Sequence, residues 1–553
     1  MRLQMFRKFA RLVPKRRTLA SAGVLTASGI LGYYSLEESY RKQIRISSSG
    51  IVRFLRTLRI GTIISVDYWL TNNLSPDSLS ACHLRCSSRI LDGCLRNGGV
   101  YVKLGQGLVA MNHILPEEYL DTLEVLHDRA LRDLPLDEVE KTFIEDFGDK
   151  PQSLFNSFEP ECVAAASLAQ VFKAQTKEGR DVAVKIQYSD LRARFSGDVW
   201  TLGILVSLAG WMHPDYDFRW VLDYLRTSLV RELDFEIEAE NMRKCARDLA
   251  DLHFIMVPEI VDSLSSKRVL TMDWIDGIKI NRNSELQEKG YSLHDIDFKL
   301  IKASSTQVFR HGFLHGDPHP GNVLVVPNPK KPTDPYLCLL DHGLYERLDD
   351  STRLSLCSLW RSIVYNDDNG MRESSKRLGV PEENYRIFCE LLVQRPLLFR
   401  ARSGVPLAKG LSKREMQYMK EMAAKRFDEI MACLRVLPRP MLLVFRNINT
   451  VRSIAKTHGH PVDRFSVMAR EADLALFRRK FRDGRMILYR KLYSNLIYVI
   501  RRAQLELFLV CVRVADWVSR HVQRIVLYYN QDVADLVDHV KRSHEKRERF
   551  LVE

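Results

Sequence analysis

The sequence predicts an α+β protein with two lobes and with helical extensions at both ends. Two pairs of short apolar runs predict the strands, 169–174 with 181–187 and 322–326 with 336–340. Helical spacing of apolar residues, with few turn signals, covers most of the remaining chain. At 553 residues the chain is long enough for more than one domain. We expect an N-terminal segment 1–36, a helical extension 37–150, a central domain 151–400 and a C-terminal helical region 401–553.

The composition is that of a globular protein with an anionic partner. Hydrophobic residues make up 46% of the chain, and the net charge is +14. A nucleotide or a phospholipid surface fits this charge better than nucleic acid, because no motif for reading bases is present. The ten cysteines are scattered without a C-x-x-C pair, which suits a reducing compartment. We expect the one small group, Cys82-His83 with Cys86, to lie on a helix surface rather than at a zinc ion.

The N-terminal segment has the features of a mitochondrial targeting sequence. Residues 1–17 carry seven basic residues and no acidic one, and residues 18–36 carry no charge. The uncharged run approaches the length that spans a bilayer, so we expect inner-membrane association with a single-pass anchor. A cleaved presequence and a secretory signal remain alternatives.

The helical extension contains a Lys-x-Gly-Gln motif. Residues 37–98 carry a helical pattern that breaks near Asn72-Asn73 and Pro76. Lys103 and Gln106 follow, three residues apart, and share one face if this segment is helical. Gly105 between them lets another backbone or a ligand approach closely. An ordinary exposed helix is the alternative, because this spacing alone is common.

The first strand pair ends in a lysine that suits phosphate binding. Lys185 closes the run Val182-Ala183-Val184-Lys185, like the strand lysine that grips nucleotide phosphates in kinases. The preceding loop has alanines where a kinase has glycines, and it should be stiffer and bind phosphates differently. The loop comprises Ala164, Ala165, Ala166 and Ser167. A plain β-hairpin is the alternative.

The second strand pair carries three oxygen-bearing side chains. Asp317 and Asn322 lie in the run from His315 to Asn322, and Asp341 precedes His342-Gly343 after the hairpin. This order is typical of a kinase catalytic loop and metal-binding turn. Asp317 would accept or orient the proton of an attacking oxygen, while Asn322 and Asp341 would hold Mg²⁺. The alternative is a histidine-rich turn between two buried strands. A motif of this length indicates phosphoryl-transfer chemistry much more specifically.

Taken in chain order, these features resemble the UbiB family, the aarF-domain-containing atypical kinases, over about residues 90–400. The Lys-x-Gly-Gln motif and the alanine-rich loop are the most specific features, together with acidic motifs at 232–235 and 238–241. The SVDYW run at 65–69 and the Asp-His-Gly turn are most similar to the mitochondrial aarF-domain kinase number five subgroup.

The resemblance implies a bilobal protein-kinase-like fold in which the Lys-x-Gly-Gln helix covers the active site. Lys103 would pair with Glu232 and Asp234 and block the site for a protein substrate. ATP or ADP with Mg²⁺ would bind, and the output would be ATP hydrolysis or phosphoryl transfer linked to coenzyme Q and mitochondrial lipid homeostasis. By family position Glu238 is the partner of Lys185, with Glu236 as the second choice.

Three further segments fit this arrangement. We expect one helix over 224–251 to carry the acidic partner of Lys185, and a helix over 298–311 to precede the catalytic loop. The run 269–277 resembles the strand and hinge between kinase lobes. Extra helical material over about 189–214 separates Lys185 from Glu238.

Two departures argue against a protein substrate. Unlike ordinary protein kinases, the chain contains the helical insertion over about 189–214. It also lacks Ala-Pro-Glu after Asp341, where the sequence instead enters a helix near Asp350. His342 replaces the usual Phe of the metal-binding turn. This puts in doubt the switch between active and inactive states that depends on the Phe, but not the metal role of Asp341. A catalytically weak scaffold, a protein serine/threonine kinase and a choline- or aminoglycoside-type kinase are the alternatives.

The C-terminal region shows no second catalytic motif. From 485 to 524 there are eight basic and two acidic residues, with apolar runs too short to span a bilayer. Two interpretations stay open: the segment lies on an anionic membrane, or it packs on the central domain with basic outer faces. The oligomeric state and the substrate are not predicted.

Overall fold

The computed structural model describes residues 37–74, 78–109, 116–127, 135–165, 168–189, 191–212, 219–397, 413–482 and short stretches between 499 and 522. The targeting segment and anchor expected within residues 1–36 lie outside this part. Within the described ranges, no helix combines the length and the apolar character needed to cross a bilayer. Half of the basic stretch 485–524, including all of 485–498, is likewise outside the described residues.

The smaller lobe is built on an antiparallel sheet of four strands in the order β1-β2-β3-β5. The strands are β1 (Ser157–Ala165), β2 (Ala169–Gln175), β3 (Asp181–Gln187) and β5 (Val269–Asp273). Alternation along β3 buries Val182, Val184 and Ile186 against helix α7 (Leu136–Phe147) and short α8 (Pro151–Leu154). Lys185 therefore points to the other face, in register with Val171 and Leu270.

The helix expected over 224–251 is wrong as a single element. The inserted helix α9 (Leu191–Met212) leads into α10 (Arg219–Glu232) and then α11 (Phe235–Asp248). The chain breaks at Leu233-Asp234 because Asp234 has an extended conformation and its carboxylate accepts a hydrogen bond from the N–H of Glu236. This N-cap starts α11 independently and places Glu232 and Glu238 on different helices.

The larger lobe contains a second four-stranded sheet in the order β4-β9-β8-β6. Its strands are β4 (Ile255–Met256), β6 (Ile278–Lys279), β8 (Val323–Val326) and β9 (Tyr336–Leu339). The hairpin predicted from the sequence is formed by β8 and β9, and a small ladder joins β7 (Phe313–His315) to β10 (Tyr345–Arg347). Helix α12 (Asn283–Glu288) and helix α13 (Leu293–Ser305) precede β7, and the last turn before it, Thr306–His311, is a π-helix.

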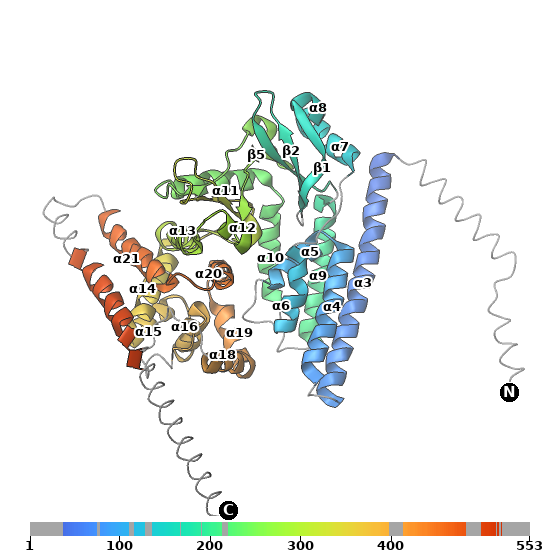
Figure 1. Cartoon of the computed structure of the whole chain (residues 1–553). Coiled ribbons are helices and arrows are strands. Elements are labelled where there is room, and N and C mark those ends of the chain that lie inside the picture. Colours follow the sequence, from blue (N-terminus) through green and yellow to red (C-terminus); the bar gives the residue numbers. More distant parts are fainter. Residues whose placement is uncertain are drawn as a thin grey trace, which may run out of the picture.

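The N-terminal helices lie along the inserted helices. Helices α3 (Glu38–Leu74), α4 (Leu79–Asn97), α5 (Val100–Val109) and α6 (Glu117–Leu123) gather beside α9 and α10 (Figure 1). Their shared apolar cluster contains Tyr101, Leu126 and Leu191. Cys82 and Cys86 are buried in it, so the expectation that they lie on a helix surface is wrong.

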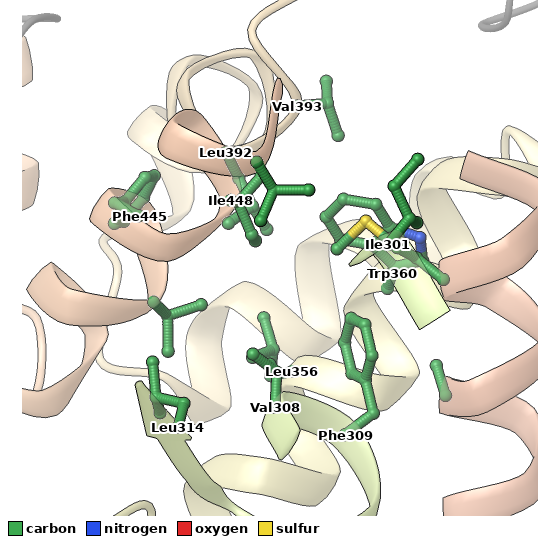
Figure 2. Close-up of a cluster of buried hydrophobic side chains, with 14 of the residues drawn as sticks. Ile301, Val308, Phe309, Leu314, Leu356, Trp360, Leu392, Val393, Phe445 and Ile448 are labelled. Carbon is green, nitrogen blue, oxygen red and sulfur yellow. The ribbon is translucent and has the colours of Figure 1, made fainter. Parts of the chain in front are cut away.

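The C-terminal helices share the core of the larger lobe. They are α14 (Asp350–Tyr365), α15 (Asp368–Arg377), α16 (Tyr385–Val393), α18 (Lys413–Lys425), α19 (Phe427–Val436), α20 (Pro440–Thr457) and α21 (Arg464–Arg482). Figure 2 shows Phe309 and Trp360 in the same apolar cluster as Phe445 and Ile448 of α20. Residues beyond 400 are thus built into the same core as the residues that precede the catalytic loop.

Candidate active site

His315 anchors the start of the catalytic loop. Its Nδ1 accepts a hydrogen bond from the N–H of Asp317 (3.1 Å), and its Nε2 lies 3.2 Å from the carbonyl of Leu340. Burial lowers the pKa of His315, so the ring is neutral and Nε2–H donates to Leu340. One buried imidazole therefore ties Asp317 to the end of β9, immediately before Asp341.

Asp317 is held by a residue that sequence reasoning missed. Arg446 of α20 lies 2.7 Å from the carboxylate, and both side chains are largely buried. The next residue, Asn447, donates a hydrogen bond to the carbonyl of His315 (2.8 Å). A helix far downstream in the chain thus fixes both the carboxylate and the backbone of the loop. No local motif marks Arg446, so nothing in the sequence could have identified it.

Asn322 and Asp341 come together through the β8–β9 hairpin. The N–H of Leu340 donates to the carbonyl of Asn322 (2.8 Å), which places Asp341 beside it. The side-chain nitrogen of Asn322 donates to the carbonyl of Asp317 (3.3 Å) and leaves the amide oxygen as a ligand. Asp341 has a left-handed conformation (φ 52°), which is rare outside glycine and is typical of functional turns.

The charge state of Asp341 suits a hard cation. Burial favours the neutral acid, but Lys185 and then Lys103 outweigh it and lower the pKa of Asp341. A carboxylate and an amide oxygen are the ligands that Mg²⁺ takes in proteins, often completed by phosphate oxygens and water. Asn322 and Asp341 therefore fit a magnesium ion by the chemistry of their oxygen atoms.

Lys185 contacts two carboxylates at once. Its ammonium lies 2.8 Å from Glu238 and 3.3 Å from Asp341. Burial opposes the charge, yet Asp341 and Glu238 outweigh it and raise the pKa of Lys185. Glu236, the second choice as its partner, is exposed and lies 3.9 Å from Lys267 instead. The structure thus joins β3, α11 and the turn that begins at Asp341 at one ammonium group.

The turn after Asp341 is locked to α11. The N–H of His342 donates to Glu238 (3.2 Å), and Asn241 donates to the carbonyl of His342 (3.0 Å). The buried imidazole lies 3.0 Å from the hydroxyl of Tyr345 and 2.9 Å from the carbonyl of Leu339. Burial lowers the pKa of His342 to about 3, so its ring is neutral and Nε2–H donates to Leu339.

This neutral histidine predicts a loss of stability in mild acid. At pH values between the usual pKa of 6.5 and the folded value of about 3, His342 is protonated in the unfolded chain but stays neutral in the folded chain. The free energy of unfolding should therefore fall as the pH falls below 6.5, by up to about 1.4 kcal/mol per pH unit from His342. His315 contributes in the same direction, because its pKa is also lowered.

Urea denaturation of the full chain between pH 7 and pH 5 measures this slope. His342→Gln keeps a donor and an acceptor but cannot titrate, so its slope should be shallower than that of the wild type. His294→Gln, on an exposed position of α13, is the matched control and should keep the wild-type slope. Equal slopes in all three proteins would contradict a buried neutral His342.

The Lys-x-Gly-Gln helix α5 reaches the same site with one of its two polar residues. Lys103 lies 2.7 Å from Glu232, and both are largely buried. Burial opposes its charge, but the carboxylates of Glu232, Asp317 and Asp341 outweigh burial and raise the pKa of Lys103. Asp234, predicted to share Lys103, instead caps α11 and lies 4.0 Å from Lys267.

The other motif residues pack α5 rather than face the site. Gln106 is buried and donates to the carbonyl of Leu126 (2.9 Å). A Cβ on Gly105 would overlap the Cδ1 atom of Leu126, so a larger residue would require that side chain to shift. The expectation that Gln106 helps to close the site is therefore wrong, and the residue holds the helix that presents Lys103.

Lys103→Met should destabilise the chain by about 3–5 kcal/mol, because it leaves the Glu232 carboxylate buried without its cation. The double variant Lys103→Met with Glu232→Met removes both charges and should recover most of this loss. Urea denaturation of the two single variants and the double variant measures the coupling. A double variant as unstable as the sum of the two single variants would show that the pair is not coupled.

The alanine-rich loop is partly strand. Ala164 and Ala165 belong to β1 and pair with Val171 and Gln170. Irregular register on the β1 side, between Phe158 and Ala164, marks a bulge before them. Ala166 and Ser167 lie outside the described residues. The expectation of a loop over all four residues is thus wrong for the first two.

The cysteine group is not a metal site in its observed state. Cys82, Cys86 and Asp67 have their ligand atoms within 4.8 Å of one another. However, Asp67 is paired with Arg85 and Arg89 at 2.5 Å each. Burial, followed by Cys82, raises the pKa of Cys86 to about 12, so the thiol stays protonated. We assign the group to packing.

Comparison with known proteins gives consistent matches. A family model described as the ABC1 atypical kinase-like domain matches residues 125–375. The AarF domain-containing protein kinase 1 of Mus musculus is 34% identical, over 90% of this chain and 95% of its own length. The probable serine/threonine-protein kinase abkD of Dictyostelium discoideum is 38% identical, over 85% of this chain and 67% of its own length. Among solved structures, the Rv3197–erythromycin complex from Mycobacterium tuberculosis has a TM-score of 0.41 and 24% identity, covering 65% of this chain and 88% of that one.

Proposed function

Because the chain belongs to the ABC1, or aarF-domain, family of atypical kinases, we propose that it binds a Mg²⁺-nucleotide, ATP or ADP, and transfers or hydrolyses the terminal phosphoryl group. The observation that carries this proposal is the contact of one buried ammonium, Lys185, with both Glu238 and Asp341. A lysine held between a helix carboxylate and the metal-binding carboxylate is the arrangement that kinases require for phosphate binding.

Each side chain has a role that follows from its contacts. Lys185 would bind the nucleotide phosphates, and Glu238 fixes its position. Asn322 and Asp341 would hold Mg²⁺, which neutralises charge on the phosphates when bound. Asp317 would orient the attacking oxygen and accept its proton, while Arg446 keeps that carboxylate in place.

The covering helix favours a substrate smaller than a protein. Lys103 pairs α5 with Glu232, and its charge is also stabilised by Asp317 and Asp341, so we infer that a substrate reaches Asp317 past this helix. The sequence also lacks the Ala-Pro-Glu segment on which protein kinases dock peptides. We propose a lipid-like or small-molecule acceptor, or water, in mitochondrial lipid or coenzyme Q homeostasis.

One surface feature and two properties of the sequence support a lipid partner. Helix α9 exposes Trp200, Ile204, Leu208 and Trp211, which repeat at helical spacing on one face. The chain has a net charge of +14, which favours an anionic surface. The basic start of the sequence supports association with the mitochondrial inner membrane.

Two other functions remain alternatives. A catalytically weak scaffold is disfavoured, because every side chain that phosphoryl transfer requires is present and paired. A protein serine/threonine kinase would have to admit a peptide past Lys103 and would lack the usual docking segment. The choline- and aminoglycoside-type kinases do not account for the Lys-x-Gly-Gln helix.

The fate of a labelled γ-phosphate tests the proposal. The full chain is incubated with Mg²⁺ and ATP carrying a labelled terminal phosphate, with vesicles of mitochondrial lipid extract and with a generic peptide mixture. We expect label in free phosphate or in the lipid fraction, and none in these fractions with Asp341→Asn. Label confined to peptides would support the protein kinase, and no Mg²⁺-dependent release in any fraction would support the scaffold.

A further inference from the structure

Three arginines meet away from the catalytic loop, among the C-terminal helices. Arg395 follows α16 and is only 7% exposed, Arg452 lies on α20 and Arg464 begins α21. The ring of Phe465, which forms the base of the cluster, lies next to two of the three guanidinium groups. The guanidinium of Arg464 lies 4.2 Å from its centroid and that of Arg395 lies 6.0 Å away.

This base is rigid. Phe465 stacks on Trp360, with centroids 6.1 Å apart and planes 20° apart, and Trp360 is fully buried in the core shown in Figure 2. Arg464 also donates to the carbonyl of Val393 (3.0 Å), the last residue of α16. The guanidinium groups are therefore positioned by the packed core and not by solvent-exposed loops.

Two of these guanidinium groups have unmet hydrogen-bonding capacity. The Nε atoms of Arg452 and Arg464 are buried and have no hydrogen-bond partner. Neither residue forms an ion pair within the part of the chain that the structure describes. Buried donors are almost always paired in folded proteins, and a buried charge normally has a counter-ion. An orphaned nitrogen on each of two neighbouring arginines therefore calls for a ligand that accepts hydrogen bonds.

The local charge balance is positive. Burial, and then Arg452 and Arg395, lower the pKa of Arg464, while burial and then Arg395 lower that of Arg452. Two acids offset part of this charge. Glu415 and Asp463 raise the pKa of Arg395, and Asp463, which also caps α21 by accepting from the N–H groups of Phe465 and Ser466, raises that of Arg464. Three cations thus face two anions. The segment 398–412, which is outside the described residues, contains no acidic residue in its sequence.

We propose that Arg395, Arg452 and Arg464, here called the arginine cluster, form a binding site for a phosphate-type oxyanion. Guanidinium groups donate paired hydrogen bonds that match the oxygens of a phosphate monoester or diester. The anion would accept hydrogen bonds from the two unpaired Nε–H groups and relieve the repulsion between the three cations. The phosphate belongs either to a soluble ion or to a lipid headgroup.

The site is separate from the nucleotide site but shares a helix with it. Helix α20 carries Arg446 to Asp317 and Arg452 to the cluster. These two residues are six positions apart, which at about 100° per residue directs them to different sides of the helix. An anion at the cluster therefore does not require a nucleotide at Asp317, and the two can be tested independently.

Thermal unfolding of the full chain tests the proposal with saturating Mg²⁺-ADP present, so that the nucleotide site is occupied. Potassium phosphate is compared with potassium chloride at equal ionic strength. We expect phosphate to raise the melting temperature by about 2 °C or more in the wild type and in Lys456→Gln, an exposed control on α20. Arg452→Gln and Arg464→Gln should lose this response, and without phosphate Arg452→Gln should melt no lower than the wild type.

A second arm distinguishes the source of the phosphate. Flotation with phosphatidylcholine vesicles, with or without phosphatidic acid, is measured for the same proteins. Binding to phosphatidic acid that both cluster variants lose, with no response to inorganic phosphate, supports the site with a lipid headgroup as its ligand. A response to inorganic phosphate alone supports it with a soluble ligand.

Arginine labelling keeps the test valid if a variant fails to fold. Wild-type chain is treated with phenylglyoxal, and the modified residues are mapped by mass spectrometry. Phosphate or phosphatidic acid should protect Arg452 and Arg464 but not the exposed Arg435. Equal labelling with and without both probes, or variants that respond to them like the wild type, would overturn the assignment.

Discussion

Replacing Asp317 with asparagine should lower the turnover of ATP about 10²–10⁴-fold, because an amide cannot accept the proton of the attacking oxygen. The affinity for Mg²⁺-ADP should change by less than about threefold, since Asp317 pairs with Arg446, whereas Lys185, the proposed phosphate ligand, pairs with Glu238 and Asp341. Steady-state phosphate release and calorimetric titration with Mg²⁺-ADP measure the two quantities separately.

The control is Asp251→Asn, an exposed acid that pairs with Arg310 on the surface of the same lobe. It should leave both turnover and affinity unchanged. A normal turnover in Asp317→Asn would contradict a role for this carboxylate in proton transfer. A loss of affinity equal to the loss of turnover would assign Asp317 to binding instead.

Lys185→Met should weaken Mg²⁺-ADP binding by at least about 30-fold, which corresponds to about 2 kcal/mol. The same change should destabilise the chain by about 3–5 kcal/mol, because Glu238 stays buried next to Asp341 without the ammonium between them. Titration with Mg²⁺-ADP and urea denaturation measure the two effects.

A second substitution separates stability from binding. Adding Glu238→Gln to Lys185→Met removes the stranded charge, so stability should recover while nucleotide binding stays weak. Lys173→Met on the neighbouring strand β2, where the lysine lies 5.1 Å from the ring of Trp274, is the matched control. Wild-type affinity in Lys185→Met would exclude the lysine from phosphate binding.

The parts of the site that local sequence determines could be predicted. The β8–β9 hairpin follows from two apolar runs and a proline-containing turn, and it alone brings Asn322 beside Asp341. The partner of Lys185 could be predicted only through family position, because several acids of the same region share helix faces. Spacing alone did not separate Glu238, which is buried, from Glu236, which is exposed.

The contacts that depend on tertiary packing could not be predicted. Arg446 and Asn447 reach the catalytic loop because α20 packs against β7, and no motif near them indicates this. The spacing predicts that Gln106 shares a face with Lys103, yet the side chain of Gln106 is buried and donates to the carbonyl of Leu126. The break between α10 and α11 depends on one side-chain cap at Asp234, which a helical apolar pattern conceals.

We propose that Lys185, Asn322 and Asp341 together form a magnesium-dependent nucleotide site. Calorimetric titration of the full chain with ADP, with and without Mg²⁺, tests it most directly when wild type and Asp341→Asn are compared. We predict one site per chain in the wild type with an affinity that rises on adding Mg²⁺, and no magnesium dependence in Asp341→Asn. No binding to the wild type, or the same magnesium-dependent binding in both proteins, would contradict the claim.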